Sequence, residues 1–250
     1  MSPRSVVVTG ANRGIGLGLV QQLLKDKSIR HVIATARDVE KASDLKAITD
    51  SRLHILPLSV TSDESTDSFV KEVSKIVGEE GLNLLVNNAG VLLKCTSKSK
   101  PNRALLTEQL DVNTVSVVLL SQKFLPLLTK AASKISGDDL SVSRAAVVTI
   151  SSGLGSIRDN TIGSGWFEGL AYRMSKAAIN QFNRTFAVDL KEEHILAVSF
   201  APGWIQTDLG GPNAMFTVEQ ATSELVAALP KLNNAHNGGF FNRDLTPCNF

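Results

Sequence analysis

One tyrosine and one lysine lie four residues apart in a stretch with the apolar spacing of a helix, residues 171–193. Tyr172, the only tyrosine in the chain, and Lys176 would share one face of that helix. A phenol has a pKa of about 10 and is a poor acid or base near neutrality. An ammonium one helical turn away favours the phenolate and brings its pKa towards the working range. The pair is typical of a general acid–base group, but such pairs also arise by chance.

A glycine-rich turn near the start of the chain predicts a phosphate-binding site. A short apolar run at residues 5–9 is followed by Gly10, Gly14 and Gly16, and then by a helical pattern. Such a turn lets the backbone approach a pyrophosphate, and the helix N-terminus supplies N–H donors and a positive dipole end. The alternative is a tight turn without a ligand. A P-loop is excluded, because no Gly-Lys-Ser/Thr follows.

The end of the second predicted strand, residues 31–36, indicates which dinucleotide would bind. An acidic residue about 20 residues past the turn would hold a ribose hydroxyl, whereas an arginine would hold a 2′-phosphate. Arg37 offers a planar fork suited to phosphate, and Arg13 is a second candidate cation. Asp38 could hold the ribose, but we interpret it as the N-cap of a helix starting near Val39. These residues favour NADP(H).

Strands and helices alternate along the chain. Apolar runs and periodicity predict strands at 5–9, 31–36, 53–58, 82–86, 145–150, 195–200 and 239–241. They predict helices at 15–24, around the apolar stripe of Phe69, Val73, Ile76 and Val77, and at 101–133, 171–193 and 218–229. Pro126 should kink the third of these helices. Such alternation implies parallel strands joined by right-handed crossovers. We expect an α/β fold: one doubly wound Rossmann domain over residues 1–250, with a parallel sheet of about seven strands and helices on both faces.

Charge, apolar runs and cysteines exclude several classes of protein. The 26 basic and 24 acidic residues are too evenly balanced for a nucleic-acid-binding protein. No apolar run approaches the roughly 20 residues of a membrane span. The two cysteines, Cys95 and Cys248, form neither a disulfide framework nor a metal site, so we expect no metal and a cytoplasmic protein. A Ser-His-Asp hydrolase is disfavoured, because there is no G-x-S-x-G elbow.

Several motifs occur together in a fixed order, and the chain resembles a classical short-chain dehydrogenase/reductase. It is most similar to the carbonyl-reductase branch and its sniffer-type members. The motifs are the turn from Thr9 to Gly16, Asn87-Asn88-Ala89-Gly90, Asn113, Ser151-Ser152, Tyr172-x-x-x-Lys176 and Pro202-Gly203.

The resemblance implies a catalytic tetrad of Asn113, Ser152, Tyr172 and Lys176. Tyr172 would be the general acid when a carbonyl is reduced. Lys176 would hold the nicotinamide ribose hydroxyls and lower the tyrosine pKa. Ser152 would hydrogen-bond the substrate oxygen, and Asn113 would hold a water that joins Lys176 to solvent.

The resemblance also implies an NADP(H)-binding surface and an activity. That surface would consist of Gly10, Asn12, Arg13, Gly14, Ile15, Gly16, Arg37, Ser59, Val60, Asn87, Ala89, Gly90, Tyr172, Lys176, Pro202, Gly203, Ile205 and Thr207. The implied activity is NADP(H)-dependent reduction of an aldehyde, ketone or quinone. The alternative is a non-catalytic NADP(H)-binding redox sensor or partner-binding module with the same fold.

Two departures from the family pattern stand out. Ser59 takes the place of a usual aspartate against the adenine, which should weaken cofactor binding without abolishing it. The spacing between Ser152 and Tyr172 is longer than usual, and the additional stretch, residues 159–168, carries Trp166 and Phe167. This insert is either a flap over the substrate or a surface loop.

Apolar residues in three variable loops predict a small apolar carbonyl substrate. They are Leu92, Leu93, Trp166, Phe167, Trp204, Leu209 and Phe216. The helices at 101–133 and 171–193 carry more apolar positions than one sheet can cover. In the family the same helix pair of a second subunit often covers the surplus, so we expect a homodimer or homotetramer.

Overall fold

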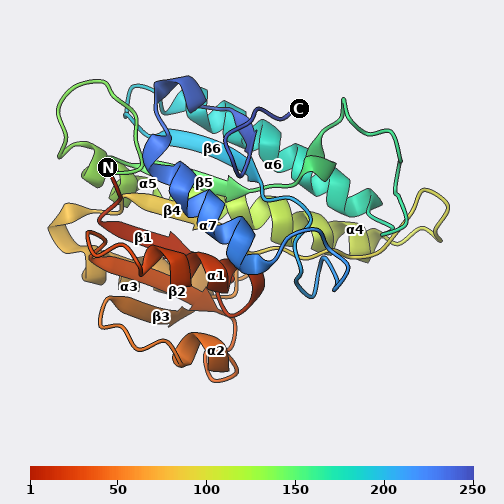
Figure 1. Ribbon diagram of the computed structural model, residues 1–250, viewed down its shortest axis with the longest axis horizontal. Coiled ribbons are helices and arrows are strands. Elements are labelled where there is room, and N and C mark those ends of the chain that lie inside the picture. Colours follow the sequence, from red (N-terminus) through yellow and green to blue (C-terminus); the bar gives the residue numbers. More distant parts are fainter.

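Seven parallel strands form a single sheet in the computed structural model, which describes residues 1–250 (Figure 1). The strands are β1 (Ser5–Val8), β2 (His31–Ala36), β3 (Leu53–Pro57), β4 (Leu84–Asn87), β5 (Ala146–Ile150), β6 (Leu196–Ala201) and β7 (Phe240–Asn242). Their order across the sheet is β3-β2-β1-β4-β5-β6-β7. The order reverses between β1 and β4, where doubly wound sheets bind their ligands. The predicted doubly wound α/β fold is confirmed.

Helices cover both faces of the sheet. They are α1 (Gly14–Leu23), α2 (Ser43–Lys46), α3 (Asp63–Val77), α4 (Arg103–Leu110), α5 (Ser116–Ala132), α6 (Leu170–Asp189) and α7 (Val218–Ala228). In Figure 1, α1 and α7 lie in front of the strands. Val6 of β1 faces this layer and belongs to the same apolar core as Leu19 and Leu225. Its neighbour Val7 faces the other layer, where Phe69 and Phe124 pack, because successive strand residues point to opposite faces.

The long helix predicted at 101–133 is three segments in the structure. Helices α4 and α5 are joined by a five-residue π-helical segment, Asp111–Val115. Helix α5 continues through Pro126, and the interruption ends eleven residues before the proline, at Val115. The whole stretch Arg103–Ala132 is long and apolar enough to cross a membrane by length and composition alone, which the sequence analysis did not expect. It packs as a core helix, however, with Phe124 and Leu128 fully buried against the sheet.

Other boundaries differ from the sequence-based expectations. No helix starts near Val39: α2 begins at Ser43, so the interpretation of Asp38 as a helix N-cap is wrong. Asp38 instead accepts a hydrogen bond from the Glu40 N–H within a turn. Helix α6 ends at Asp189, short of residue 193, because four residues of turn bring the chain to His194, which has a positive φ of 56°.

Three loops gather at the edge formed by the carboxyl ends of the strands, on the right of Figure 1: residues 88–102, 151–169 and 202–216. The first two are joined by backbone hydrogen bonds. The Cys95 N–H donates to the Glu168 carbonyl at 2.7 Å, and the Leu170 N–H donates to the Cys95 carbonyl at 3.1 Å. The insert is therefore anchored beside the loop that follows β4.

Candidate active site

At two positions, the glycine turn between β1 and α1 leaves no room for a side chain. Gly10 has a φ of +63°, and a Cβ there would come within 2.9 Å of the Ala89 Cα. A Cβ on Gly16 would lie 2.3 Å from the Gly10 carbonyl oxygen. The backbone can pack this closely to the end of β4 only because these positions are glycine. The turn therefore presents bare backbone at the point where the strand order reverses.

Side chains from the neighbouring strands hold the turn in place. The Asn88 Nδ2 donates to the carbonyls of Thr9 and Gly10, at 2.8 and 3.1 Å. The Thr9 Oγ1 in return accepts hydrogen bonds from the N–H groups of Asn88 and Ala89. From β2, the Thr35 Oγ1 accepts from the Gly10 N–H at 3.1 Å. Sequence analysis gave no role to Asn88 or Thr35, which position the turn from strands far away in sequence.

The N-terminus of α1 is open to an anion. Its N-cap residue, Arg13, makes no side-chain hydrogen bond to the helix, and the first turn holds no acidic residue. Free backbone N–H groups and the positive end of the helix dipole therefore face the turn. This arrangement can hold a phosphate group.

The two candidate cations for a 2′-phosphate are in different situations. Arg37 is exposed directly after β2 and makes no ion pair. Arg13 is already paired with Asp208 of the 202–216 loop, at 2.5 Å. Asp38 pairs with Lys41 at 3.1 Å, and the hydrogen bond from Lys41 lowers the pKa of its carboxyl. Arg37 is thus the cation that remains free.

The adenine-side residues lie at the end of β3, beside this rim. Ser59 and Val60 are half-buried. The Ser59 N–H donates to the Ser65 Oγ at 2.9 Å, and the Ser59 hydroxyl makes no hydrogen bond within the chain. The Ser59 hydroxyl therefore remains available to a ligand.

Ser152, Tyr172 and Lys176 come together between β5 and α6. The Ser152 side chain is close enough to the Tyr172 phenol to lower the pKa of that phenol by hydrogen bonding. The Lys176 Nζ lies 5.5 Å from the Tyr172 ring centroid and donates to the Ile150 carbonyl at 2.8 Å. Tyr172 is 7% exposed and Lys176 is 5% exposed. The phenol, the hydroxyl and the amine thus form one cluster, as the i, i+4 spacing predicted.

Burial controls the charge state of both titratable groups in this cluster. It raises the pKa of Tyr172 to about 12, although the hydrogen bond with Ser152 lowers it. It also lowers the pKa of Lys176 to about 8. The expected lowering of the tyrosine pKa by the lysine is therefore not found here, because desolvation of the phenolate outweighs it. Tyr172 is a protonated phenol at neutral pH, which is the form a proton donor needs.

Asn113 lies in the π-helical segment and is 1% exposed. Its Nδ2 donates to the Val91 carbonyl at 2.9 Å and to the Ser175 Oγ at 3.1 Å, and its Oδ1 accepts from the Val91 N–H. Both amide N–H groups are thus used. The side chain joins the loop after β4 to α6, and of its polar atoms only the second lone pair of Oδ1 remains for the predicted water.

Gln109 is a positioning residue that sequence analysis missed. It is fully buried, its Nε2 donates to the Val91 carbonyl at 2.8 Å, and its Oε1 accepts from the Leu93 N–H at 2.7 Å. Gln109 and Asn113 are four residues apart and hold the same loop. The signal available in the sequence was two amide side chains at helical spacing within an otherwise apolar helix.

The loop after β6 lies across the glycine turn. Gly203 has a φ of +94°, and Ile205 is 3% exposed. A Cβ on Gly14 would meet the Thr207 Cγ2 at 3.2 Å, so this loop reaches the start of α1. The predicted cofactor-binding residues of the two segments therefore lie next to each other. Asn87 is buried below them and donates to the Ser121 Oγ at 3.0 Å.

The insert meets the loop after β6 through aromatic side chains. The rings of Trp166 and Trp204 are 5.5 Å apart, and Trp166 is 74% exposed. Phe167 is half-buried and packs edge to face with Trp166. The Arg173 guanidinium lies 5.5 Å from the centroid of the Phe167 ring. This contact places the insert at the rim of the site and favours a flap over a detached surface loop.

A family model described as short chain dehydrogenase matches residues 4–215. The chain belongs to the short-chain dehydrogenase family. The match spans the glycine turn, the Ser152–Tyr172–Lys176 cluster and most of the loop after β6.

Solved structures and a curated relative extend this assignment. The candidate carbonyl reductase Sniffer of Caenorhabditis elegans is 65% identical, covers 100% of both chains and has a TM-score of 0.93. The NADPH-bound carbonyl reductase from chicken fatty liver is 38% identical, covers 100% of this chain and 95% of its own, and has a TM-score of 0.95. Short-chain dehydrogenase anuI of Penicillium roqueforti is 32% identical over 89% of this chain and 87% of its own length. The resemblance to sniffer-type carbonyl reductases is confirmed.

Proposed function

We propose that this short-chain dehydrogenase is an NADP(H)-dependent reductase of carbonyl compounds. The observation that carries the proposal is the buried cluster of Ser152, Tyr172 and Lys176, in a fold whose glycine turn can hold a pyrophosphate. A proton donor alone would fit many reactions. A proton donor next to an anion-binding glycine turn fits hydride transfer to a polarised carbonyl.

The residues at the carboxyl ends of β1, β2 and β3 fit NADP(H). The bare backbone at Gly10 and Gly16 and the open N-terminus of α1 suit the pyrophosphate. Arg37 suits the 2′-phosphate, because a guanidinium binds phosphate in a planar fork. The half-buried Ser59 hydroxyl would face the adenine. The NADPH bound by the chicken enzyme supports the same cofactor here.

The chain's own residues supply orientation and a proton. NADPH, when bound, supplies the hydride. Ser152 would hydrogen-bond the carbonyl oxygen and hold it within reach of the Tyr172 phenol. Tyr172 would donate its proton to that oxygen as negative charge develops on it. Lys176 would bind the ribose hydroxyls and stabilise the phenolate left behind. Asn113 would hold the loop after β4 in place against α6.

Apolar side chains around the entrance support an apolar carbonyl substrate. Trp166, Trp204, Leu209 and Met215 are exposed on the insert and on the loop after β6. The test is a panel of aromatic aldehydes, ketones and quinones, with consumption of NADPH followed by absorbance. We expect turnover of apolar members and little of hydrophilic ones. Binding of NADPH without turnover of any member would favour a redox sensor or partner-binding module instead.

The pKa of Lys176, lowered to about 8 by burial, predicts a pH dependence. The ammonium form exists below that pH, so kcat/KM for NADPH should fall as pH rises through about 8. This parameter reports groups of the free enzyme. In the Lys176→Arg variant kcat/KM should be lower but should not fall near pH 8, because a guanidinium stays charged. An unchanged fall near pH 8 in this variant would assign it to another group.

We further propose that the protein is a homodimer or homotetramer. Leu119 of α5, and Met174 and Val188 of α6, are apolar and between 38% and 62% exposed on helices that pack side by side. The occupant we propose is the same face of a second copy. Light scattering should give a mass of at least about twice 26.8 kDa, and a Leu119→Glu, Val188→Glu variant should give the monomer mass. A monomer mass for the unaltered protein at micromolar concentration would contradict this.

A further inference from the structure

Arg243 lies directly after β7, outside the cluster and the glycine turn, and holds the base of the loop after β6. Its side chain is 17% exposed. Its Nη1 donates to the Pro202 carbonyl at 3.4 Å, and a Cβ on Gly203 would come within 2.9 Å of the same nitrogen. The guanidinium is therefore in direct contact with the Pro202-Gly203 backbone.

The same guanidinium stacks on the far end of that loop. The Arg243 Cζ is 3.7 Å from the centroid of the Phe216 ring. Phe216 closes the loop by two backbone hydrogen bonds: its N–H donates to the Trp204 carbonyl at 3.1 Å, and its carbonyl accepts from the Gln206 N–H at 2.9 Å. One cation thus contacts both the beginning and the end of the segment 202–216. Stacking of this kind on an aromatic ring is attractive, most strongly where water is largely excluded.

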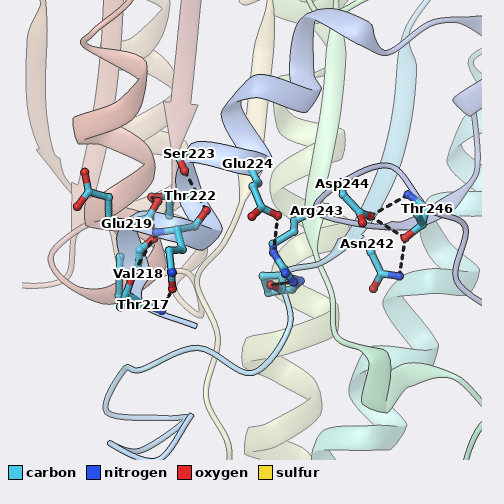
Figure 2. A network of polar contacts seen from close by, with 12 residues as sticks. Thr217, Val218, Glu219, Thr222, Ser223, Glu224, Asn242, Arg243, Asp244 and Thr246 are labelled. Carbon is cyan, nitrogen blue, oxygen red and sulfur yellow. Dashed lines mark hydrogen bonds and ion pairs between the residues drawn. The ribbon is translucent and has the colours of Figure 1, made fainter. Parts of the chain in front are cut away.

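Glu224 forms an ion pair with the guanidinium. Its Oε2 lies 2.7 Å from the Arg243 Nε, and Figure 2 shows Glu224 reaching down from α7 to Arg243. The N-terminus of α7 is itself stabilised, because Thr217 and Gln220 form a reciprocal capping box. Asp244, the next residue, points the other way and bonds Thr246, so it is not part of this contact (Figure 2).

We infer that Arg243 is a positioning residue that sets the conformation of the 202–216 loop against the nicotinamide half of the cofactor. The inference rests on the proposed function, because it takes Pro202, Gly203, Ile205 and Thr207 of this loop as the residues that would bind the nicotinamide, as the family resemblance implies. Arg243 acts through Pro202 and Phe216 and touches neither the cofactor nor the substrate. The adenosine half is held elsewhere, by the glycine turn and Arg37, and does not depend on it.

This separation of the two halves provides the test. In Arg243→Met, which keeps a long side chain but loses the charge, the Kd for NADPH should rise about tenfold. The Kd for adenosine 2′,5′-bisphosphate, which lacks the nicotinamide half, should stay within about twofold of the unaltered protein. Both are measured by isothermal titration calorimetry. Arg243→Lys should recover part of the NADPH affinity, since an ammonium can still sit over the Phe216 ring.

Two further variants keep the test decisive. Asp244→Asn is the matched control and should change neither Kd. Should Arg243→Met not fold, Glu224→Gln keeps the arginine but removes its ion pair, and it should weaken NADPH alone by about threefold. Unchanged NADPH affinity, or equal weakening of both ligands, in these variants would overturn the inference. Failure of the unaltered protein to bind NADPH would overturn the proposed function, and the inference with it.

Discussion

Replacing Tyr172 with phenylalanine should lower kcat for carbonyl reduction by about 10²- to 10⁴-fold, the range typical for loss of a general acid. Burial keeps the phenol protonated, with a pKa raised to about 12, and Ser152 is its hydrogen-bond partner. Phenylalanine fills the same buried space and removes only the hydroxyl, so the aromatic packing stays. The measurement is steady-state turnover of the best carbonyl from the substrate panel.

The control for this variant is cofactor binding. Tyr172→Phe should bind NADPH within about twofold of the unaltered protein, because Lys176 and the glycine turn remain. Ser152→Ala should also lower kcat, but without changing which group donates the proton. Near-normal turnover in the phenylalanine variant would show that Tyr172 is not the acid.

Removing Arg37 should shift cofactor preference towards NADH. A charge-assisted hydrogen bond contributes roughly 1.5–3 kcal/mol, so one bond to the 2′-phosphate favours NADPH by about 10- to 100-fold. Arg13 was the second candidate, but its ion pair with Asp208 leaves Arg37 as the free cation. In Arg37→Ile, the ratio of kcat/KM for NADPH to that for NADH should fall by about that factor at fixed salt.

Adding a carboxylate at position 36 should shift the cofactor preference further towards NADH. In the double variant Ala36→Asp, Arg37→Ile, the aspartate would bind the ribose hydroxyls and repel a 2′-phosphate. Ala36 is 2% exposed, so this variant also needs a melting temperature to separate lost stability from altered preference. Arg30→Ile is the matched control: Arg30 is exposed at the opposite end of β2 and should not change the ratio. Equal use of NADH and NADPH by the unaltered protein would show that Arg37 does not reach the site.

Periodicity and turn chemistry were enough to predict the sheet, because each buried strand is a short local run. The predicted strand ends moved by one or two residues, as at β4, which begins at Leu84. The interruption at Asp111–Val115 could not be found this way, since the apolar pattern continues across it. The break follows from tertiary contacts: Asn113 must reach both Val91 and Ser175.

The candidate site, too, could be predicted from the sequence only in part. Tyr172 and Lys176 could be paired from sequence, because an i, i+4 spacing on a helix fixes their proximity. The pKa of Tyr172 could not be judged, since it depends on how deeply α6 packs against β5. Contacts between distant segments could not be predicted either, among them the stacking of Arg243 on Phe216 and the ion pair of Arg13 with Asp208. The turn at Asp38 was mistaken for a helix start because an aspartate suits both positions.

Isotope transfer from the cofactor to the product would show directly whether this cluster carries out carbonyl reduction. The unaltered protein is given an apolar aldehyde and NADPH that carries deuterium on the transferable position of the nicotinamide ring. We expect an alcohol with one deuterium on the former carbonyl carbon, formed in step with NADPH consumption and nearly abolished in Tyr172→Phe. Alcohol without deuterium on that carbon, or full transfer in the phenylalanine variant, would contradict it.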